Sequence, residues 1–203
     1  MAAVERMAEL ARRALPTGSG TVAELGCGTG ELLGALAQAG PLDGIGFDLS
    51  TTALAHAART WPALTWVVTN ADRRLPLQDG SLDLVMSLNA RRNPTDCARV
   101  LKPGGRVLVG LPAAADLQEL REAVQGAAVA RERWEAVVDD HAGLFQLLER
   151  DTVTSHFHLE GPSLQDLLLA TYRGVRHGSA GQVQQLTALS ITLATDILCF
   201  ARR

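Results

Sequence analysis

Short apolar runs alternate with amphipathic segments along the first half of the chain. Apolar runs of about four to eight residues bounded by turn residues predict buried strands, and apolar positions three and four apart predict helices. The expected strands are 21–25, 43–49, 64–69, 82–88 and 106–111, and the expected helices are 4–15, 31–39, 51–59 and 95–101. Strands that follow one another through helices pair in parallel, because only a long crossover connects parallel neighbours.

The pattern changes in the second half, where one helix and a loop separate the last two expected strands. We expect a mostly helical segment at 116–150, a strand at 152–160, a helix at 163–172 and a last strand at 191–200. The prediction is an α/β fold with a doubly wound, mostly parallel seven-stranded Rossmann-like sheet and an antiparallel edge strand. We expect one domain over 1–203, with a first half at 1–112 and a second half at 113–203.

Composition narrows the class of protein. The formal net charge of -3 over 203 residues mildly disfavours a large nucleic-acid footprint, and we expect no DNA partner. Cys27, Cys97 and Cys199 are far apart in the sequence, which predicts neither a disulfide framework nor a metal site and fits a cytoplasmic protein. His156 and His158 share one face of an expected strand, but no third ligand lies nearby. No run of about 18 apolar residues occurs, so we expect no membrane span and no membrane partner.

A glycine-rich turn lies between the first expected strand and the helix after it. The segment 26–30 reads G-C-G-T-G, and Asp48 ends the next expected strand. Glycine permits positive φ and a close approach of a ligand to the main chain, and an acidic residue about 20 positions later can bind ribose hydroxyls. The pair predicts a nucleotide-type cofactor site. The alternatives are glycines that serve packing alone and an aspartate that caps a helix.

Four segments resemble class I S-adenosylmethionine-dependent methyltransferases. They are E-L-G-C-G-T-G at 24–30, F-D-L-S at 47–50, N-A-D-R-R-L-P-L-Q-D-G-S-L-D-L-V at 70–85 and A-R-V-L-K-P-G-G-R-V-L-V at 98–109. The resemblance implies S-adenosylmethionine as cofactor and S-adenosylhomocysteine as product. It also implies a cofactor site, with Glu24, Gly26 and Gly28 beside the amino-acid part and with Cys27 and Gly30 of the same turn next to the cofactor. Asp48 would bind the ribose, Leu49, Asn70, Ala71 and Asp72 would lie at the adenine, and Leu88 and Asn89 would approach the sulfonium. The half at 1–112 is then the cofactor-binding half of the domain, and the half at 113–203 is the substrate-side half.

A narrower resemblance, to the ribosomal large-subunit RNA guanine-N1 methyltransferases, covers more of the chain. It rests on N-A-D-R-R-L-P at 70–76, A-R-R-N at 90–93, D-L-Q-E-L-R-E at 116–122 and L-L-L-A-T-Y-R-G-V-R at 167–176. That family begins with a four-ligand zinc finger, which these residues lack. Arg91 stands where the family usually has a proline, and Val175 stands where it has a tryptophan.

The acceptor side of the site is predicted from the segment after the fourth strand and from one late tyrosine. Asn89, Arg92 and Tyr172 are the candidate catalytic residues, and Arg91, Arg92 and Tyr172 are the candidate acceptor-binding residues. The narrower resemblance implies rRNA modification at guanine N1. A small-molecule methyltransferase and a protein that binds S-adenosylmethionine without transferring the methyl group remain alternatives, and the oligomeric state stays open. The alternatives without a functional role are that Arg91 and Arg92 lie on a solvated face of the protein and that Tyr172 ends a helix.

Overall fold

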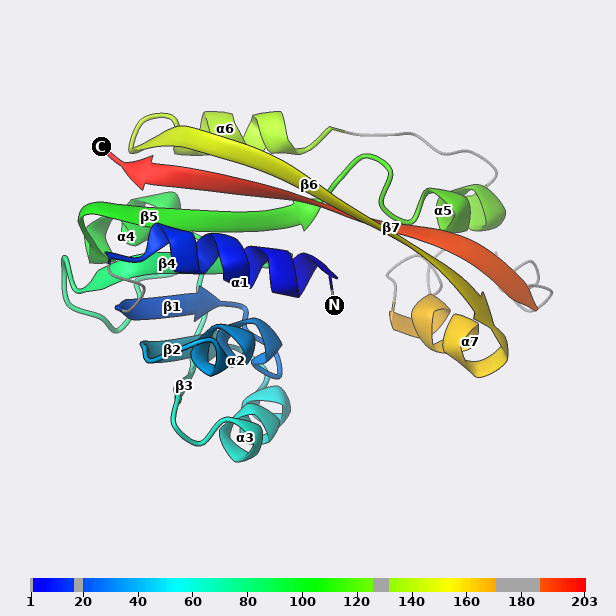
Figure 1. The fold of residues 1–203 in the computed structure, drawn as a ribbon, viewed down its shortest axis with the longest axis horizontal. Helices are drawn as coiled ribbons and strands as arrows, with labels where there is room; N and C mark the ends of the chain where they lie inside the picture. The colour runs from blue at the N-terminus through cyan, green and yellow to red at the C-terminus, as the bar shows by residue number, and fades with distance from the viewer. Residues whose placement is uncertain (1, 17–19, 126–131, 171–186) are drawn as a thin grey trace. The chain divides into compact units, whose positions relative to one another are not determined.

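The computed structural model describes residues 2–16, 20–125, 132–170 and 187–203 (Figure 1). Its elements are α1 (Ala2–Ala14), β1 (Thr21–Leu25), α2 (Glu31–Gln38), β2 (Asp43–Asp48), α3 (Thr51–Thr60), β3 (Thr65–Val68), β4 (Leu82–Leu88), α4 (Pro94–Val100), β5 (Leu101–Pro112), α5 (Gln118–Gln125), α6 (Trp134–His141), β6 (Phe145–Glu160), α7 (Gly161–Ala170) and β7 (Ala188–Arg202).

Within the described residues, seven strands form one sheet in the order β3-β2-β1-β4-β5-β7-β6. β1 pairs in parallel with both β2 and β4, and the pairs β2–β3 and β4–β5 are parallel as well. β7 runs opposite to β5 and β6 (Figure 1). The prediction of a mostly parallel, doubly wound sheet with antiparallel pairing at one edge is confirmed. The strand order reverses beside β1, and ligands of such sheets bind at the carboxyl ends of the strands at this point.

Helices cover both faces of the sheet because alternate strand residues are apolar on both sides. On one face Leu84 and Met86 of β4 pack in one cluster with Leu10 of α1 and Leu33 of α2. On the other face Val85 packs in a second cluster that includes three buried residues of α4, Cys97, Ala98 and Val100. Burial of this apolar surface from both sides fixes the strand register, since a one-residue slip would expose it.

The chain divides into two compact units. The first unit comprises 1–111, 134–153 and 196–203, and it contains β1 to β4 and the helices that pack on them. The second unit comprises 112–133 and 154–195, and within it Leu120 of α5 packs with Leu164 and Leu168 of α7. The expected division into a cofactor-binding and a substrate-side half stays a prediction.

The expected helical segment 116–150 is wrong at its end. α5 and α6 are helical, but β6 begins at Phe145 and extends to Glu160. Exposure alternates from Phe145 onward, with Phe145 buried and Gln146 exposed, as a strand with one solvated face requires. The fifth strand begins earlier than the expected 106–111, because β5 runs from Leu101 to Pro112 and includes the Pro-Gly-Gly segment 103–105. Its pairing with β4 shifts register between Leu82 and Leu84. The last two residues of the expected helix 163–172 lie outside the described residues.

Candidate cofactor and acceptor site

The glycine turn joins the carboxyl end of β1 to α2 by backbone contacts. The amides of Gly26 and Cys27 both donate to the carbonyl of Phe47 at the end of β2, at 2.8 and 3.0 Å. Gly26, Gly28 and Gly30 have φ of 68°, 53° and 84°, a region that other residues rarely adopt. The turn is therefore tied to β2, and its conformation requires glycine.

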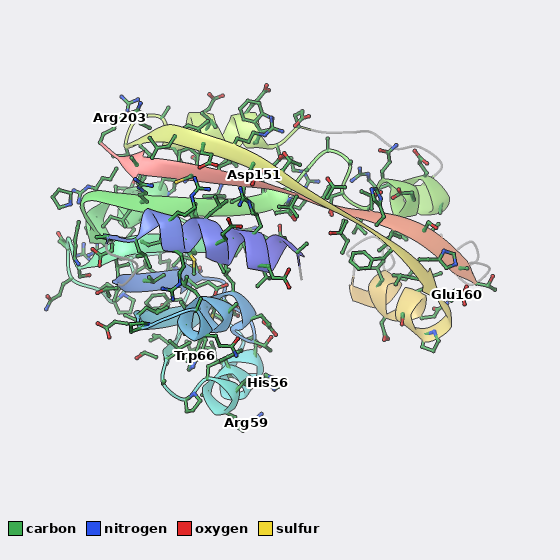
Figure 2. The ribbon with its side chains drawn as sticks, in the orientation of Figure 1. His56, Arg59, Trp66, Asp151, Glu160 and Arg203 are labelled. Atoms are coloured by element: carbon green, nitrogen blue, oxygen red, sulfur yellow. The ribbon has the colours of Figure 1, made fainter. Side chains whose placement is uncertain are left out.

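Side chains pack closely around two of these glycines. A methyl group at Gly26 would overlap the side chain of Ala90, which follows β4. A methyl group at Gly30 would overlap the indole of Trp66, the β3 residue labelled in Figure 2. Open space surrounds the corresponding position at Gly28. The turn thus has packed sides at Gly26 and Gly30 and an open side at Gly28.

Asp48 connects the end of β2 to the glycine turn. One carboxylate oxygen accepts the amide of Gly28 at 2.8 Å, and the other accepts the amide of Ser50 at 2.8 Å. Ser50 in turn caps α3, because its hydroxyl accepts the amide of Ala53 at 3.2 Å. A carboxylate held in this way has lone pairs left for further donors such as ribose hydroxyls.

A first cavity of about 190 Å³ opens at the carboxyl ends of β1, β2 and β3. Leu49 is 67% exposed at this cavity, which leaves a large apolar side chain free to contact a flat ring. Six of the residues predicted for the cofactor line the cavity, together with Arg91 and three residues that sequence reasoning missed. The predicted six are Gly26, Asp48, Leu49, Asn70, Ala71 and Asp72, and the missed three are Phe47, Thr69 and Ala90. Phe47 and Thr69 are sequence neighbours of predicted residues, and Ala90 precedes Arg91.

The five other residues predicted for the cofactor do not line this cavity. They are Glu24, Cys27, Gly28, Gly30 and Leu88. Glu24 is 3% exposed, and its carboxylate accepts the amide of Leu33 at 3.0 Å in the first turn of α2, where Gly30 provides no capping side chain. Burial raises the pKa of Glu24 to about 8. Burial also raises the pKa of the Cys27 thiol, which disfavours a nucleophilic thiolate.

A second cavity of about 480 Å³ adjoins the first, with which it shares Asp72, Ala90 and Arg91. Its lining is Asp72, Ala90, Arg91, Arg92, Asn93, Pro94 and Asp140. It lies at the end of β4, where the sequence predicted the acceptor. Asn89, the other catalytic candidate of this segment, has a φ of 55° and donates its amide to the carbonyl of Gly110 at 2.8 Å, but it lines neither of the two cavities.

The two predicted arginines differ in their surroundings. Arg91 is 88% exposed, and its guanidinium lies 3.4 Å from the carboxylate of Asp72. Arg92 is part-buried, donates from Nη1 to the carbonyl of Ala90 at 3.4 Å, and has a buried Nε without a hydrogen-bond partner. Burial lowers the pKa of Arg92 from its ordinary value. Tyr172, the remaining acceptor candidate, lies outside the described residues.

Asp140 lines the second cavity and was not predicted. It lies in the last turn of α6, in the first unit. The sequence contains Glu135, Asp139 and Asp140 on this short helix, and the helical period alone does not tell which carboxylate meets a cavity. No sequence signal was available to single it out.

The two histidines predicted to share a strand face line neither of the two cavities. His156 contacts the hydroxyl of Thr192 at 3.2 Å, and His158 contacts the hydroxyl of Ser190 at 3.0 Å. Over the ranges that the structure covers, three or more metal-ligating side chains nowhere gather in one group. Those same ranges contain no helix long and apolar enough to cross a membrane.

Known proteins resemble this chain in sequence over one segment and in fold over most of its length. Residues 22–105 match the family described as Methyltransferase domain. A TehB-like S-adenosylmethionine-dependent methyltransferase from Corynebacterium glutamicum has a similar structure, with a TM-score of 0.58, 18% identity, and coverage of 97% of this chain and 87% of that one. Residues 22–105, which run from β1 to the start of β5, are therefore similar in sequence to a methyltransferase domain, and the chain has the fold of the Corynebacterium glutamicum protein.

Two curated relatives are similar over part of their length. The 23S rRNA (guanine(748)-N(1))-methyltransferase of Streptomyces fradiae is 37% identical over 122 residues, which are 59% of this chain and 44% of that protein. A demethylmenaquinone methyltransferase of Tropheryma whipplei is 36% identical over 98 residues, which are 43% of this chain and 40% of that protein. The matched segments span less than half of each relative.

Proposed function

We propose that this chain transfers a methyl group from S-adenosylmethionine to an acceptor held in the second cavity. The observation that carries the proposal is the first cavity, which places Asp48, Leu49 and Gly26 together at the point where the strand order reverses. Asp48 would accept hydrogen bonds from the ribose, Leu49 would contact the adenine, and Gly26 would admit the methionine part. When bound, the cofactor supplies a methyl group already activated on a sulfonium.

The chain's own residues position the acceptor and handle its proton. Methyl transfer from a sulfonium is an in-line displacement, so much of the acceleration comes from holding the acceptor atom in line with the methyl group. The second cavity adjoins the first and supplies Arg91 and Arg92 for this purpose. Asn89 and Tyr172 remain further candidates for contact with the acceptor.

We propose guanine N1 in ribosomal RNA as the acceptor. Similarity to the Streptomyces fradiae enzyme supports this assignment. The motif residues Asp72, Arg92 and Asn93 support it further, because they line the second cavity.

A small-molecule acceptor is the second candidate, and the charge distribution favours it. The chain has a net charge of -3, and the second cavity carries two carboxylates, Asp72 and Asp140, against the two arginines. A surface built for RNA phosphates usually has a clear excess of basic residues. The similarity to a demethylmenaquinone methyltransferase is consistent with this alternative.

Label transfer from radioactive S-adenosylmethionine tests the proposal, with total bacterial RNA and a small-metabolite extract assayed in parallel. We expect label in RNA from the wild type, its loss in Asp48→Ala, and its retention in Asp43→Ala, which changes an exposed carboxylate at the other end of β2. Label in the extract alone would transfer the proposal to a small molecule. No label in either, with S-adenosylmethionine still bound, would contradict methyl transfer and favour a binding protein.

A further inference from the structure

Arg92 is a part-buried cation without an ion pair at contact distance among the described residues, and Asp140 is the carboxylate whose charge acts on it from farther away. In the described part of the chain, no Asp or Glu oxygen lies within 4.0 Å of its guanidinium, and its one hydrogen bond is the 3.4 Å contact with the carbonyl of Ala90. Its Nε is buried without a partner. An unsatisfied guanidinium at a cavity wall is unfavourable on its own, so it favours a ligand that brings an oxygen acceptor.

Asp140 is the complementary group in the same cavity. Its side chain is 62% exposed and accepts no hydrogen bond from the described residues. The nearest ring nitrogen is His141 Nδ1 at 3.8 Å, but this nitrogen lies 2.7 Å from the carbonyl of Val137 and must donate to it. Burial lowers the pKa of His141, so the ring stays neutral and gives Asp140 no counter-charge.

The end of α6 is held firmly, which fixes the backbone that carries Asp140. The ring of His141 is fully buried and stacks on Phe200 with the centroids 4.8 Å apart. Phe145 lies against the same ring at 5.7 Å. Asp140 therefore projects from an anchored helix end rather than from a free loop.

We propose that Arg92 and Asp140 together bind the lactam edge of the acceptor, an N–H group next to a carbonyl, and that Asp140 removes the proton from this nitrogen. This inference rests on the proposed methyl transfer. Arg92 donates to the carbonyl oxygen and stabilises the negative charge that moves onto it. As the nitrogen–carbon bond forms, the sulfur–carbon bond breaks, S-adenosylhomocysteine leaves, and the proton stays on Asp140.

This arrangement discriminates among nucleobases. Guanine and uracil have an N–H beside a carbonyl, whereas adenine and cytosine lack this edge. Guanine also has a 2-amino group next to N1, and a carboxylate has two oxygens that can accept from two neighbouring N–H groups. The pair therefore favours guanine. Asp72 also lines the cavity, but Arg91 lies 3.4 Å from its carboxylate, so Asp140 is the unpaired base.

Asp140→Asn tests the assignment, with Asp139→Asn as the matched control on the same helix outside the cavity. Labelled RNA is digested to nucleosides and analysed by mass spectrometry, and S-adenosylhomocysteine binding is measured on every variant. We expect 1-methylguanosine from the wild type, a loss of about 100-fold or more in its rate of formation in Asp140→Asn, and no change in Asp139→Asn. Cofactor binding should stay within twofold in both variants.

The outcomes separate this inference from the proposed function. If RNA is labelled and Asp140→Asn forms the product as fast as the wild type, the inference is overturned and methyl transfer stands. The same holds if the label is found in adenosine or cytidine. An unlabelled RNA contradicts the RNA acceptor, and the inference is then decided by titrating guanosine monophosphate onto the S-adenosylhomocysteine complex. Two results together support the inference: guanosine monophosphate binds about tenfold more weakly to Asp140→Asn than to the wild type, and adenosine monophosphate binds more weakly to the wild type than guanosine monophosphate does. Equal affinity of the wild type and Asp140→Asn for guanosine monophosphate overturns the inference.

Discussion

The two adjoining cavities are built from different parts of the chain. Backbone amides hold in place two residues that line the first cavity: the amides of Gly26 and Cys27 donate to the carbonyl of Phe47, and the amide of Gly28 donates to the carboxylate of Asp48, all at 2.8–3.0 Å. These contacts depend on positive φ at glycine and on the end of one strand. A site of this kind has a fixed shape before any ligand binds.

Long side chains shape the second cavity. The contacts of Arg91 with Asp72 and of Arg92 with Ala90 are both 3.4 Å. Asp140 comes from α6, which lies far from these residues in the sequence. Such side chains can exchange partners without moving the backbone. The comparison indicates that changes at the first cavity weaken cofactor binding, whereas changes at the second alter the rate or the choice of acceptor.

Gly26→Ala should have the largest effect, because the added methyl group overlaps Ala90 and the residue must keep a φ of 68°. We expect a loss of cofactor affinity of about 100-fold or more and a destabilisation of roughly 1–2 kcal/mol from the left-handed backbone alone. Calorimetric titration with S-adenosylhomocysteine and thermal unfolding measure both effects. Gly143→Ala, where nothing lies within 4 Å of the new methyl group, is the control. Equal affinity in the two variants would contradict a backbone-built first cavity.

Glu24→Gln should change how stability depends on pH. The pKa of Glu24 is raised from 4.5 to about 8, so between these values the unfolded chain has lost the proton that the folded chain keeps. Stability of the wild type therefore falls as pH rises through this window, by up to about 1.4 kcal/mol per pH unit from this group. Urea unfolding at pH 5, 6, 7 and 8 should give a flatter profile for Glu24→Gln. Parallel profiles would mean that Glu24 is ionised in the folded chain.

Leu49→Ala should weaken cofactor binding by about three- to tenfold, because it removes apolar area at the adenine side of the first cavity. Fluorescence or calorimetric titration with S-adenosylhomocysteine measures the change. Leu148→Ala, which removes another exposed leucine away from both cavities, should leave the affinity unchanged. An unchanged affinity in Leu49→Ala would remove Leu49 from the proposed site.

Arg91→Ala should have the smallest effect, because an exposed ion pair contributes about 0–1 kcal/mol and is screened by salt. We expect a rise of about two- to fivefold in the KM for RNA at low salt, which shrinks at high salt, with unchanged cofactor affinity. Arg59→Ala, at the exposed end of α3 labelled in Figure 2, is the control. A large loss of cofactor affinity in Arg91→Ala would mean that Arg91, which lines both cavities, serves the cofactor rather than the acceptor.

The sequence predicted the first four strands closely, because their apolar runs are bounded by glycine, proline and acidic turn residues, but it placed the start of the fifth strand at 106 where β5 begins at Leu101. It also predicted six of the residues that line the first cavity, since these follow strand ends and a glycine turn. It failed at 145–150, where the two-residue alternation of an edge strand competes with a helical interpretation. It could not predict the capping contact of Glu24 with Leu33 or the place of Asp140, because both depend on tertiary packing.

The most direct test of the account is the binding of S-adenosylhomocysteine to the wild type and to Asp48→Ala, with Asp43→Ala as the control. The account predicts saturable binding to the wild type, a loss of about 10- to 100-fold in Asp48→Ala as charged hydrogen bonds disappear, and no change in Asp43→Ala. Equal affinity in all three, or no binding to the wild type, would contradict the first cavity as the cofactor site.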